Sequence, residues 1–165
     1  MSSLDNGSSL KLGIPTLEDV DFVAANIRKS DRRDMAGLHP GKSVREIIMG
    51  DVEYSKFVYG LFRDGDIQAI FGVIPMSFGV GTPWVVGSTA VDKSPLPFAR
   101  ASRRLLDMLQ RSFPQLDTWF CAQNTKSVLW HNWCGFEFEK EKVRLGRDEY
   151  FHAFRRVARR KMEVN

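Results

Sequence analysis

The stretch that decides the fold is NTKSVLWHNWCGF, residues 124–136. Asn124 is a favourable N-cap, because its side-chain oxygen can accept a hydrogen bond from a free N–H of the first helical turn. Gly135 is a favourable helix end, since glycine readily adopts the left-handed backbone that stops a helix. Residues 118–122 and the residues from Phe136 onward are rich in strand formers. We therefore expect a strand, a capped helix and a second extended segment.

The flanking sequence extends this pattern in both directions. Downstream, residues 146–148 form a turn signal, and residues 149–154 pair back as a strand. Upstream, apolar residues recur at helical spacing over residues 98–112, and Pro114 ends that helix. We therefore expect a long helix that crosses over between two parallel strands, which is right-handed in nearly all known cases.

The N-terminal half contains two helix starts followed by strands. Thr16 caps a helix that runs to about Lys29, and Ser43 with Glu46 forms a capping box for a helix that ends near Asp51. The residues between these helices are expected to form a loop. The strands that follow are expected at residues 57–62, 67–74 and 84–91, the first two joined by a turn at 64–65.

These elements predict one α+β domain with a mixed central sheet flanked by helices. The chain has 165 residues, of which 43% are hydrophobic, enough for one core of ordinary size. We expect residues 1–9 to be a disordered leader, residues 10–155 to form the domain and residues 156–165 to be a basic tail. The leader lacks the apolar run of a signal peptide, which indicates a cytoplasmic protein, and no apolar run is long enough for a membrane span.

Composition restricts the chemistry further. Cys121 and Cys134 are expected to be core thiols rather than a disulfide, and no pair of histidines or cysteines has the spacing of a metal site. The net charge of +4 is modest. A basic tail can contact nucleic acid, but the spaced aromatic residues of a base-stacking surface are missing, so nucleic acid is not the expected partner.

The element order and the 124–136 stretch resemble the GNAT N-acetyltransferase superfamily. Asn124, Gly135 and Phe136 keep the spacing of the superfamily's late-helix signature, in which Ser127 replaces the usual Ala and His131 the usual Tyr. Over most of the chain, the closer likeness is to a phage branch that includes internal virion protein A of short-tailed phages. IRKSDRRDM at residues 27–35 and GVGTPW at residues 79–84 carry that likeness.

The resemblance implies a GNAT-like acyl-CoA N-acyltransferase fold that uses acetyl-CoA as its acyl donor. The superfamily usually opens the long helix with Arg-x-x-Gly-x-Gly/Ala, which binds the diphosphate of the donor. In this sequence Leu96 stands at the Arg position, and Ala99 and Ala101 stand at the small positions. The implied donor-binding residues are Thr89, Ala90, Val91, Ala99, Arg100, Ala101, Arg103, Asn124 and Ser127.

The resemblance also implies roles in catalysis and acceptor binding. His131 is placed to protonate the leaving thiolate, although a partly buried aromatic role is the alternative. The acceptor loop supplies Asp31, Arg32, Arg33, Asp34 and His39, with Asp34 or His39 as the base, unless these side chains only face water.

The implied acceptor is a protein amine or a small-molecule amine, and a homodimer is compatible with the fold. A non-catalytic virion or partner-binding protein with a degenerate CoA site is the alternative function, with a phage virion or host protein as its partner. A phage-encoded protein would reside in the host cytoplasm or in the virion.

Overall fold

A computed structural model describes residues 10–156; the expected leader, 1–9, and residues 157–165 of the expected tail lie outside the described residues. The elements follow one another in the order β1 (Lys11–Gly13), α1 (Leu17–Ala25), α2 (Lys29–Leu38), α3 (Val44–Tyr54), β2 (Phe57–Arg63), β3 (Asp66–Ser77), β4 (Val80–Gly87), α4 (Thr89–Lys93), α5 (Pro95–Leu109), β5 (Gln115–Leu116), β6 (Thr118–Cys121), α6 (Thr125–Trp133), β7 (Phe136–Leu145) and β8 (Asp148–Arg156).

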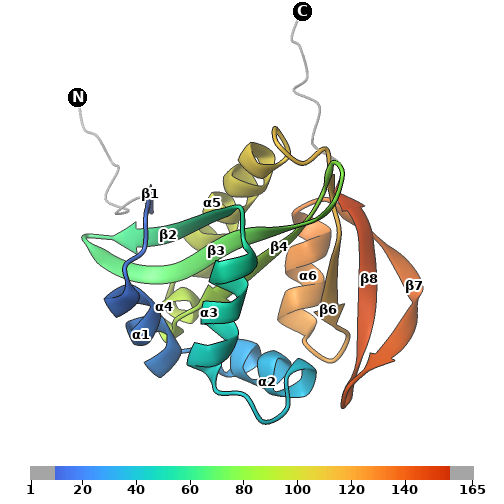
Figure 1. Cartoon of the computed structure of the whole chain (residues 1–165), viewed down its shortest axis with the longest axis horizontal. Coiled ribbons are helices and arrows are strands. Elements are labelled where there is room, and N and C mark those ends of the chain that lie inside the picture. The colour runs from blue at the N-terminus through green and yellow to red at the C-terminus, as the bar shows by residue number, and fades with distance from the viewer. Residues whose placement is uncertain (1–9, 157–165) are drawn as a thin grey trace, which may run out of the picture.

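The strands form a mixed sheet that is divided into two parts (Figure 1). The first part has the order β1-β2-β3-β4-β5, antiparallel except for the parallel pair of β4 and β5. The second part has the order β6-β8-β7 and is antiparallel. The long helix α5 joins β4 to a parallel strand, as expected, but that strand is the two-residue β5, whereas the expected strand at residues 118–122 is β6 and pairs with β8. The α+β class and the mixed sheet flanked by helices are thus confirmed.

Helices cover both faces of the five-stranded part, and side-chain alternation along β3 explains why. Ile70 packs with Val23 of α1 and Ile48 of α3 on one face. Its neighbour Phe71 points to the other face, where it packs with Leu105 of α5. Each fully buried side chain of this size stabilises the fold by roughly 1.5–3 kcal/mol relative to an exposed one.

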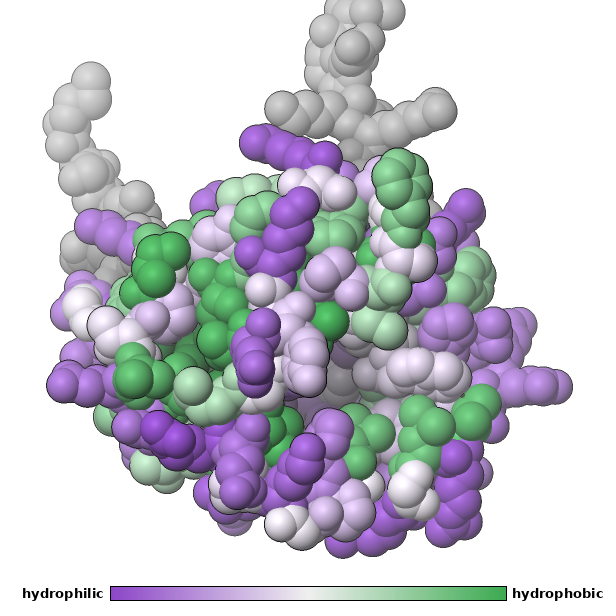
Figure 2. Space-filling view, in the orientation of Figure 1, coloured by the Kyte–Doolittle hydropathy of each residue, from purple (hydrophilic) through white to green (hydrophobic). Residues whose placement is uncertain are grey.

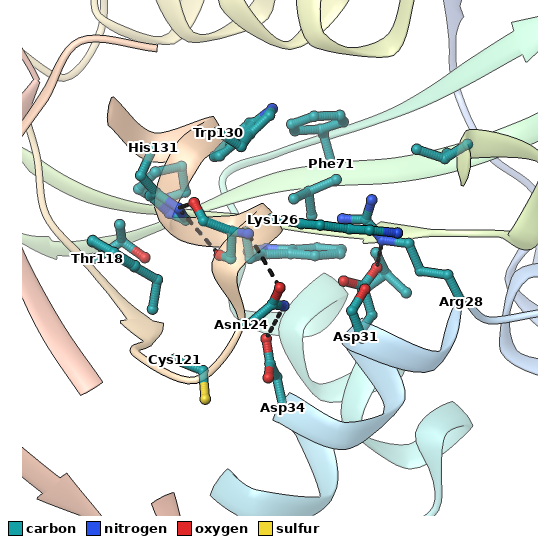
Figure 3. A pocket seen from close by; sticks show the side chains of 18 of the residues that line it. Arg28, Asp31, Asp34, Phe71, Thr118, Cys121, Asn124, Lys126, Trp130 and His131 are labelled. Carbon is teal, nitrogen blue, oxygen red and sulfur yellow. Dashed lines mark hydrogen bonds and ion pairs between the residues drawn. The ribbon is translucent and has the colours of Figure 1, made fainter. Parts of the chain in front are cut away.

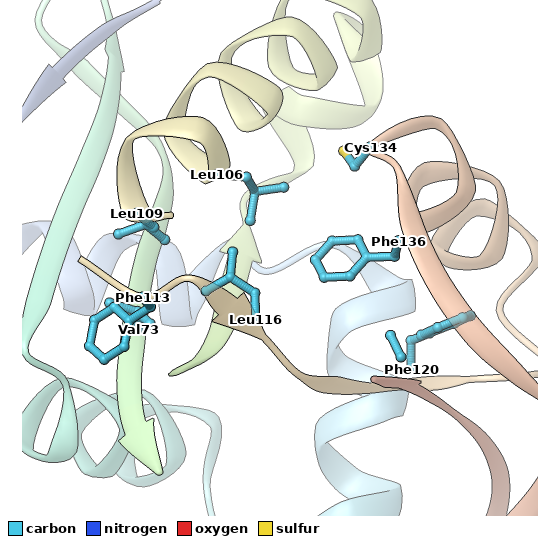
Figure 4. Packing of buried hydrophobic residues seen from close by; sticks show 9 residues of the cluster. Val73, Leu106, Leu109, Phe113, Leu116, Phe120, Cys134 and Phe136 are labelled. Carbon is cyan, nitrogen blue, oxygen red and sulfur yellow. The ribbon is translucent and has the colours of Figure 1, made fainter. Parts of the chain in front are cut away.

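A third group of buried residues joins the two parts of the sheet (Figure 4). Leu106 of α5 and Leu116 of β5 meet Phe120 of β6 and Phe136 of β7, and all four are at most 4% exposed. Because this core spans the division of the sheet, it fixes the angle at which β4 and β6 separate. That separation positions the cavity described below.

Two helices differ from the sequence-based expectations. The first helix ends at Ala25 rather than Lys29, because the Asn26 side chain donates to the Phe22 carbonyl and Ile27 then forms an isolated bridge with Ser88. The expected loop after it contains α2, which buries Gly37. A Cβ at Gly37 would lie 3.0 Å from a carboxylate oxygen of Asp148, so this close approach to the β7–β8 turn holds the helix in place.

The expected strand over residues 84–91 begins earlier, at Val80, and ends at Gly87. Thr89, Ala90 and Val91 belong to α4 instead. The Ser88 N–H still donates to Gln68 of β3 at 2.9 Å, but the Thr89 N–H donates to the Asn26 carbonyl. The connection between α1 and α2 therefore ends the strand by taking over its hydrogen bonds.

The C-terminal strand extends one residue past the expected end of the domain. Arg156, expected in the tail, is only 5% exposed. Its guanidinium donates to the Cys134 carbonyl at 2.8 Å and to Asp107 and Gln110 at 2.7 Å each. Arg156 is therefore a structural residue of the domain. Cys121 and Cys134 are both buried free thiols, as predicted.

Candidate functional site

The site begins where β4 and β5 separate. These strands pair only at Val80–Gln115 and Gly81–Leu116, and the last contact is the Asp117 N–H donating to the Gly81 carbonyl at 3.0 Å. Beyond this point β6 pairs with β8 instead of β4. A cavity of about 890 Å³ fills the resulting gap, between β4, β6, α6 and α2. Figure 2 shows a hollow on this face, bordered by both hydrophobic and hydrophilic residues.

The edge of β4 presents one backbone donor to this cavity. The Ser88 N–H points to β3, whereas the Gly87 N–H donates to Asp31 at 2.8 Å on the opposite side. Because backbone groups alternate sides along a strand, the Val85 N–H points the same way as that of Gly87, toward the gap. Pro83, the next residue on that side, has no N–H. Val85 is therefore the donor that β4 offers to a molecule in the cavity.

Asp31 closes the far end of β4 (Figure 3). Its carboxylate accepts from Arg28 Nε at 2.7 Å in addition to the Gly87 N–H. Burial raises the pKa of Asp31, and the Arg28 guanidinium opposes that rise. The Arg28 guanidinium also lies 5.5 Å from the ring centroid of Phe98 at the start of α5. Asp31, expected to bind the acceptor, is thus already engaged within the protein.

Asp34 and Asn124 meet across the cavity although they are 90 residues apart in the sequence. Asn124 Nδ2 donates to Asp34 Oδ2 at 3.0 Å, and Asn124 Oδ1 accepts from the Ser127 N–H at 3.1 Å as the N-cap of α6. The other Asp34 oxygen, Oδ1, is buried and has no hydrogen-bond partner within residues 10–156. Burial raises the pKa of the Asp34 carboxyl above its ordinary value, and the hydrogen bond from Asn124 offsets part of that rise. Asp34 is therefore a carboxylate that Asn124 orients and whose second oxygen is enclosed by the protein.

His131 is a buried ring rather than an exposed acid. It stacks on Phe120 at a centroid distance of 4.1 Å, and its Nδ1 lies 2.7 Å from the Ser127 carbonyl. A carbonyl only accepts, so Nδ1 carries the proton of the neutral imidazole. Burial lowers the pKa of His131 from 6.5 to about 4. At neutral pH the ring is uncharged and its one proton is engaged, so this geometry does not favour the expected role in protonating a thiolate.

The first turn of α5 is poor in hydrogen-bond donors. Pro95 and Pro97 occupy its first and third positions, so only Leu96 and Phe98 among the first four residues carry an N–H. Ser94, at the N-cap, makes no capping hydrogen bond, and its hydroxyl accepts from Arg63 at 3.0 Å. This turn therefore lacks half of the N–H donors with which a helix N-terminus binds phosphate.

The structure brings part of the predicted site together. The predicted residues that line the cavity are Asp31, Asp34, His39, Val91, Ala99, Asn124, Ser127 and His131. Those that do not line it are Arg32, Arg33, Thr89, Ala90, Arg100, Ala101 and Arg103. Arg103 lies over the Trp133 ring, 3.5 Å from its centroid, and donates to the Trp133 carbonyl, so it packs α5 against α6. Arg33 lies 3.9 Å from Asp148, away from the cavity.

Sequence reasoning missed two contributors to the site. The Val85 N–H could have been identified from the sequence of the apolar strand. Pro83 has no N–H, so Val85 is the next residue on the same edge of the strand that can donate a hydrogen bond. Asp51, at the expected end of a helix, also lines the cavity, and burial raises its pKa. No local signal marks Asp51, since its position depends on how α3 packs beside α2.

Comparison with known proteins identifies the fold. The chain resembles PaiA N-acetyltransferase from Thermoplasma acidophilum in complex with coenzyme A, with a TM-score of 0.61 and 11% identity over 88% of this chain and 99% of that one. It also resembles spermidine N-acetyltransferase from Vibrio cholerae in complex with coenzyme A and spermine, with a TM-score of 0.65 and 15% identity over 90% and 97% of the two chains. A third neighbour is ribosomal-protein-S18-alanine N-acetyltransferase from Escherichia coli, with a TM-score of 0.62 and 11% identity over 94% and 99%.

These likenesses establish the GNAT fold that the sequence predicted. The sequence matches no protein-family model and no curated protein. None of the helices in the described part of the chain has the length and apolar character needed to span a bilayer. Within residues 10–156, no group of three or more His, Cys, Asp or Glu side chains is placed to hold a metal ion.

Proposed function

We propose that the protein is an acetyl-CoA-dependent N-acetyltransferase that acts on an amine. The observation that carries this proposal is the open edge of β4, where the Val85 N–H faces a cavity that also contains Asp34 and Asn124. A free strand edge binds extended chains through backbone hydrogen bonds. An N–H donor beside it stabilises negative charge on a carbonyl oxygen during acyl transfer.

The fold neighbours support the same chemistry. PaiA N-acetyltransferase and the Vibrio cholerae spermidine N-acetyltransferase were both determined with coenzyme A bound. The acceptors named for two of the neighbours, spermidine and an alanine of ribosomal protein S18, both carry amine nitrogen. We therefore propose an amine acceptor for this chain as well, either a small molecule or a protein, and a homodimer remains a prediction.

The cavity fits the acyl-pantetheine part of acetyl-CoA better than its nucleotide. Val91 and Ala99 supply apolar contacts beside the β4 edge, and Ser127 supplies a hydroxyl. At the nucleotide end, the start of α5 offers few N–H donors, and the exposed cations Lys93 and Arg100 replace them only in part, because exposed ion pairs contribute little. When bound, acetyl-CoA supplies an acyl group activated as a thioester.

Asp34 is the proposed catalytic base. An amine is an ammonium ion near neutral pH and must lose a proton before it can attack a carbonyl carbon. We propose that the Asp34 carboxylate, which lines the cavity, accepts that proton, and its raised pKa makes it a stronger base than an exposed carboxylate. Asn124 acts as a positioning residue, because its amide holds the other carboxylate oxygen while its own oxygen caps α6.

His131 has a different proposed role from the one the resemblance implies. Its ring packs between Phe120, Trp130 and Phe136, so it holds α6 against β6 and shapes the cavity wall. We propose that it supports the position of Asn124, which lies at the start of the same helix.

The alternative is a non-catalytic virion or partner-binding protein, encoded by a phage. The two prolines at the start of α5 favour this alternative, because they weaken the phosphate site. Such a protein would act in the host cytoplasm or in the virion. It would bind its partner without releasing thiol from acetyl-CoA, which separates it from the enzyme.

The test is to measure acetyl-CoA binding by calorimetry and thiol release in the presence of primary amines. Wild type should bind acetyl-CoA and release thiol when an amine is present. Asn124→Ser is the informative variant, because serine keeps a helix N-cap but loses the amide that holds Asp34. It should fold normally and lose activity. A wild-type protein that neither binds acetyl-CoA nor releases thiol would refute the proposal.

A further inference from the structure

Three arginines lie along the solvent-exposed side of α5. Arg100 and Arg104 are exposed on the helix, and Arg111 is exposed in the turn that continues it, where its N–H donates to the Met108 carbonyl at 3.2 Å. At 3.6 residues per turn these positions fall within about 40° of one another around the helix axis, opposite the buried face that contains Leu105. At about 1.5 Å per residue, Arg100 and Arg111 are about 17 Å apart. Arg100, Arg104 and Arg111 are called the arginine stripe below.

The described part of the chain does not neutralise the arginine stripe. Within residues 10–156, no carboxylate forms an ion pair with any of its three arginines. The acidic residue of α5, Asp107, lies on the same side of the helix but pairs with Arg156 at 2.7 Å. Arg100 and Arg104 are one helical turn apart, and like charges at this spacing destabilise a helix. An anionic partner would remove this repulsion.

The arginine stripe lies outside the cavity described above. α5 covers the face of the sheet opposite α1 and α3 (Figure 1), and none of the three arginines lines the cavity. Arg100 is near the nucleotide end of the proposed donor site, but Arg104 and Arg111 continue the stripe toward the other end of the helix. A bound donor therefore does not account for the whole stripe.

The C-terminal segment begins beside the arginine stripe. Arg156, the last described residue, donates to Asp107 and Gln110 of the α5 region at 2.7 Å each. The sequence then continues with three more cations, Arg159, Arg160 and Lys161. Because a residue spans at most about 3.6 Å, the first of these cations lies within about 11 Å of Arg156 along the chain. The sequence thus adds positive charge next to the stripe.

The composition of this surface favours a regularly charged polymer over an acidic protein or a membrane. The exposed residues between Arg100 and Arg111 are Arg104 and Asp107, so no exposed side chain of this segment is apolar. Protein interfaces have an apolar core, and helices that lie on membranes have an apolar face. An arginine binds a phosphate through two N–H groups at once. A stripe about 17 Å long matches about five phosphates along one strand of a duplex.

We propose that the arginine stripe binds the phosphate backbone of a duplex nucleic acid without reading its sequence. Residues 100–111 include no aromatic side chain, so this surface cannot stack on the bases of a single strand. Contacts to phosphates alone position a protein on a duplex but carry no sequence information. This binding site goes beyond the proposed acetyltransferase function and does not depend on it.

The test measures binding of the full chain to duplex DNA by fluorescence anisotropy at several salt concentrations, without acetyl-CoA. Each phosphate contact contributes about −0.9 to the slope of log K against log salt concentration, so the stripe alone should give about −3. A second duplex of unrelated sequence should bind equally well. The double variant Arg104→Gln with Arg111→Gln should make the slope less steep by about 2 and weaken binding about 10-fold to 100-fold at about 0.1 M salt.

Arg144→Gln with Arg147→Gln is the matched control. It removes the same charge from two exposed arginines at the β7–β8 turn, at the opposite end of the molecule from α5 (Figure 1). The control should keep the wild-type slope and affinity. Both double variants should unfold near the wild-type temperature, because all four side chains are exposed. A wild-type slope near zero, or equal losses in the two double variants, would overturn the proposal.

Two further measurements test other assignments of the arginine stripe. If poly-glutamate binds as tightly as the duplex, the stripe is a site for acidic proteins and the nucleic-acid assignment fails. Binding of acetyl-CoA should be the same in wild type and in the Arg104→Gln, Arg111→Gln variant. If the variant loses acetyl-CoA binding together with duplex binding, the stripe belongs to the donor site and the proposal is likewise refuted.

Discussion

Acidification should destabilise this protein through His131. Burial lowers the pKa of its imidazole from 6.5 to about 4. Between these values the unfolded chain binds a proton that the folded protein does not, so the free energy of unfolding decreases as the pH falls. A tenfold change in proton affinity is worth about 1.4 kcal/mol, so the full loss is about 3 kcal/mol. It begins near pH 7 and is complete below about pH 4.

Urea unfolding of wild type and His131→Phe, followed by tryptophan fluorescence at several pH values between 7 and 4, measures this contribution. Phenylalanine keeps an aromatic ring against Phe120 but cannot bind a proton. The variant should therefore lack about 3 kcal/mol of the wild-type pH dependence, while the carboxylates contribute equally to both proteins. Between pH 7 and pH 4 the free energy of unfolding of wild type should therefore fall by about 3 kcal/mol relative to that of the variant.

Phe120→Leu is the control, because it disturbs the same ring stack and leaves His131 in place. It should lower stability at every pH by roughly 1–3 kcal/mol and keep the wild-type pH dependence. If His131→Phe shows the same pH dependence as wild type, the imidazole is not buried in its neutral form and the reasoning fails. In that case a charged His131 would again be available as an acid.

Three further predictions concern the base, the donor site and the C-terminal strand. Asp34→Asn should lower kcat about 100-fold or more. Wild-type activity should fall at low pH as Asp34 becomes protonated. A pH–rate profile in which the variant matches wild type would exclude Asp34 as the base. Pro97→Ala restores a backbone N–H donor at the start of α5. In calorimetry it should tighten coenzyme A binding about tenfold and leave the binding of pantetheine, which has no diphosphate, unchanged. An equal gain for both ligands would contradict an effect on phosphate binding. Arg156→Met leaves the Cys134 carbonyl without its buried donor and should lower the free energy of unfolding by about 2 kcal/mol in urea titrations. Arg155→Met, which breaks an exposed ion pair, should have a much smaller effect, and similar losses in the two variants would show that Arg156 is not structural.

The sequence by itself determined the helix starts at Thr16, Ser43 and Asn124 and the turn at residues 64–65, because these depend on neighbours three or four residues away. Ser43 forms the predicted capping box, Thr16 is the predicted N-cap and also forms a capping box with Asp19, and Asn124 caps α6 by accepting from the N–H of its third residue. The turn at Asp64 and Gly65 has the positive φ angles, 51° and 86°, that its sequence favours. Such local geometry, together with the order of the elements, predicted the α+β class, whereas the GNAT fold was implied by the resemblance of residues 124–136 to that superfamily's signature.

Only the tertiary structure decided which of the candidate residues form a site. The polar helix α2 carries no side-chain cap, and its contacts with β4 and the β7–β8 turn come from distant segments. Asp34 meets Asn124 across 90 residues of sequence, and Asp51 joins them because α3 packs beside α2. The His131 ring became a neutral core group for the same reason, since burial by surrounding elements sets its pKa. Long-range packing and desolvation depend on the whole fold, so no short stretch of sequence encodes them.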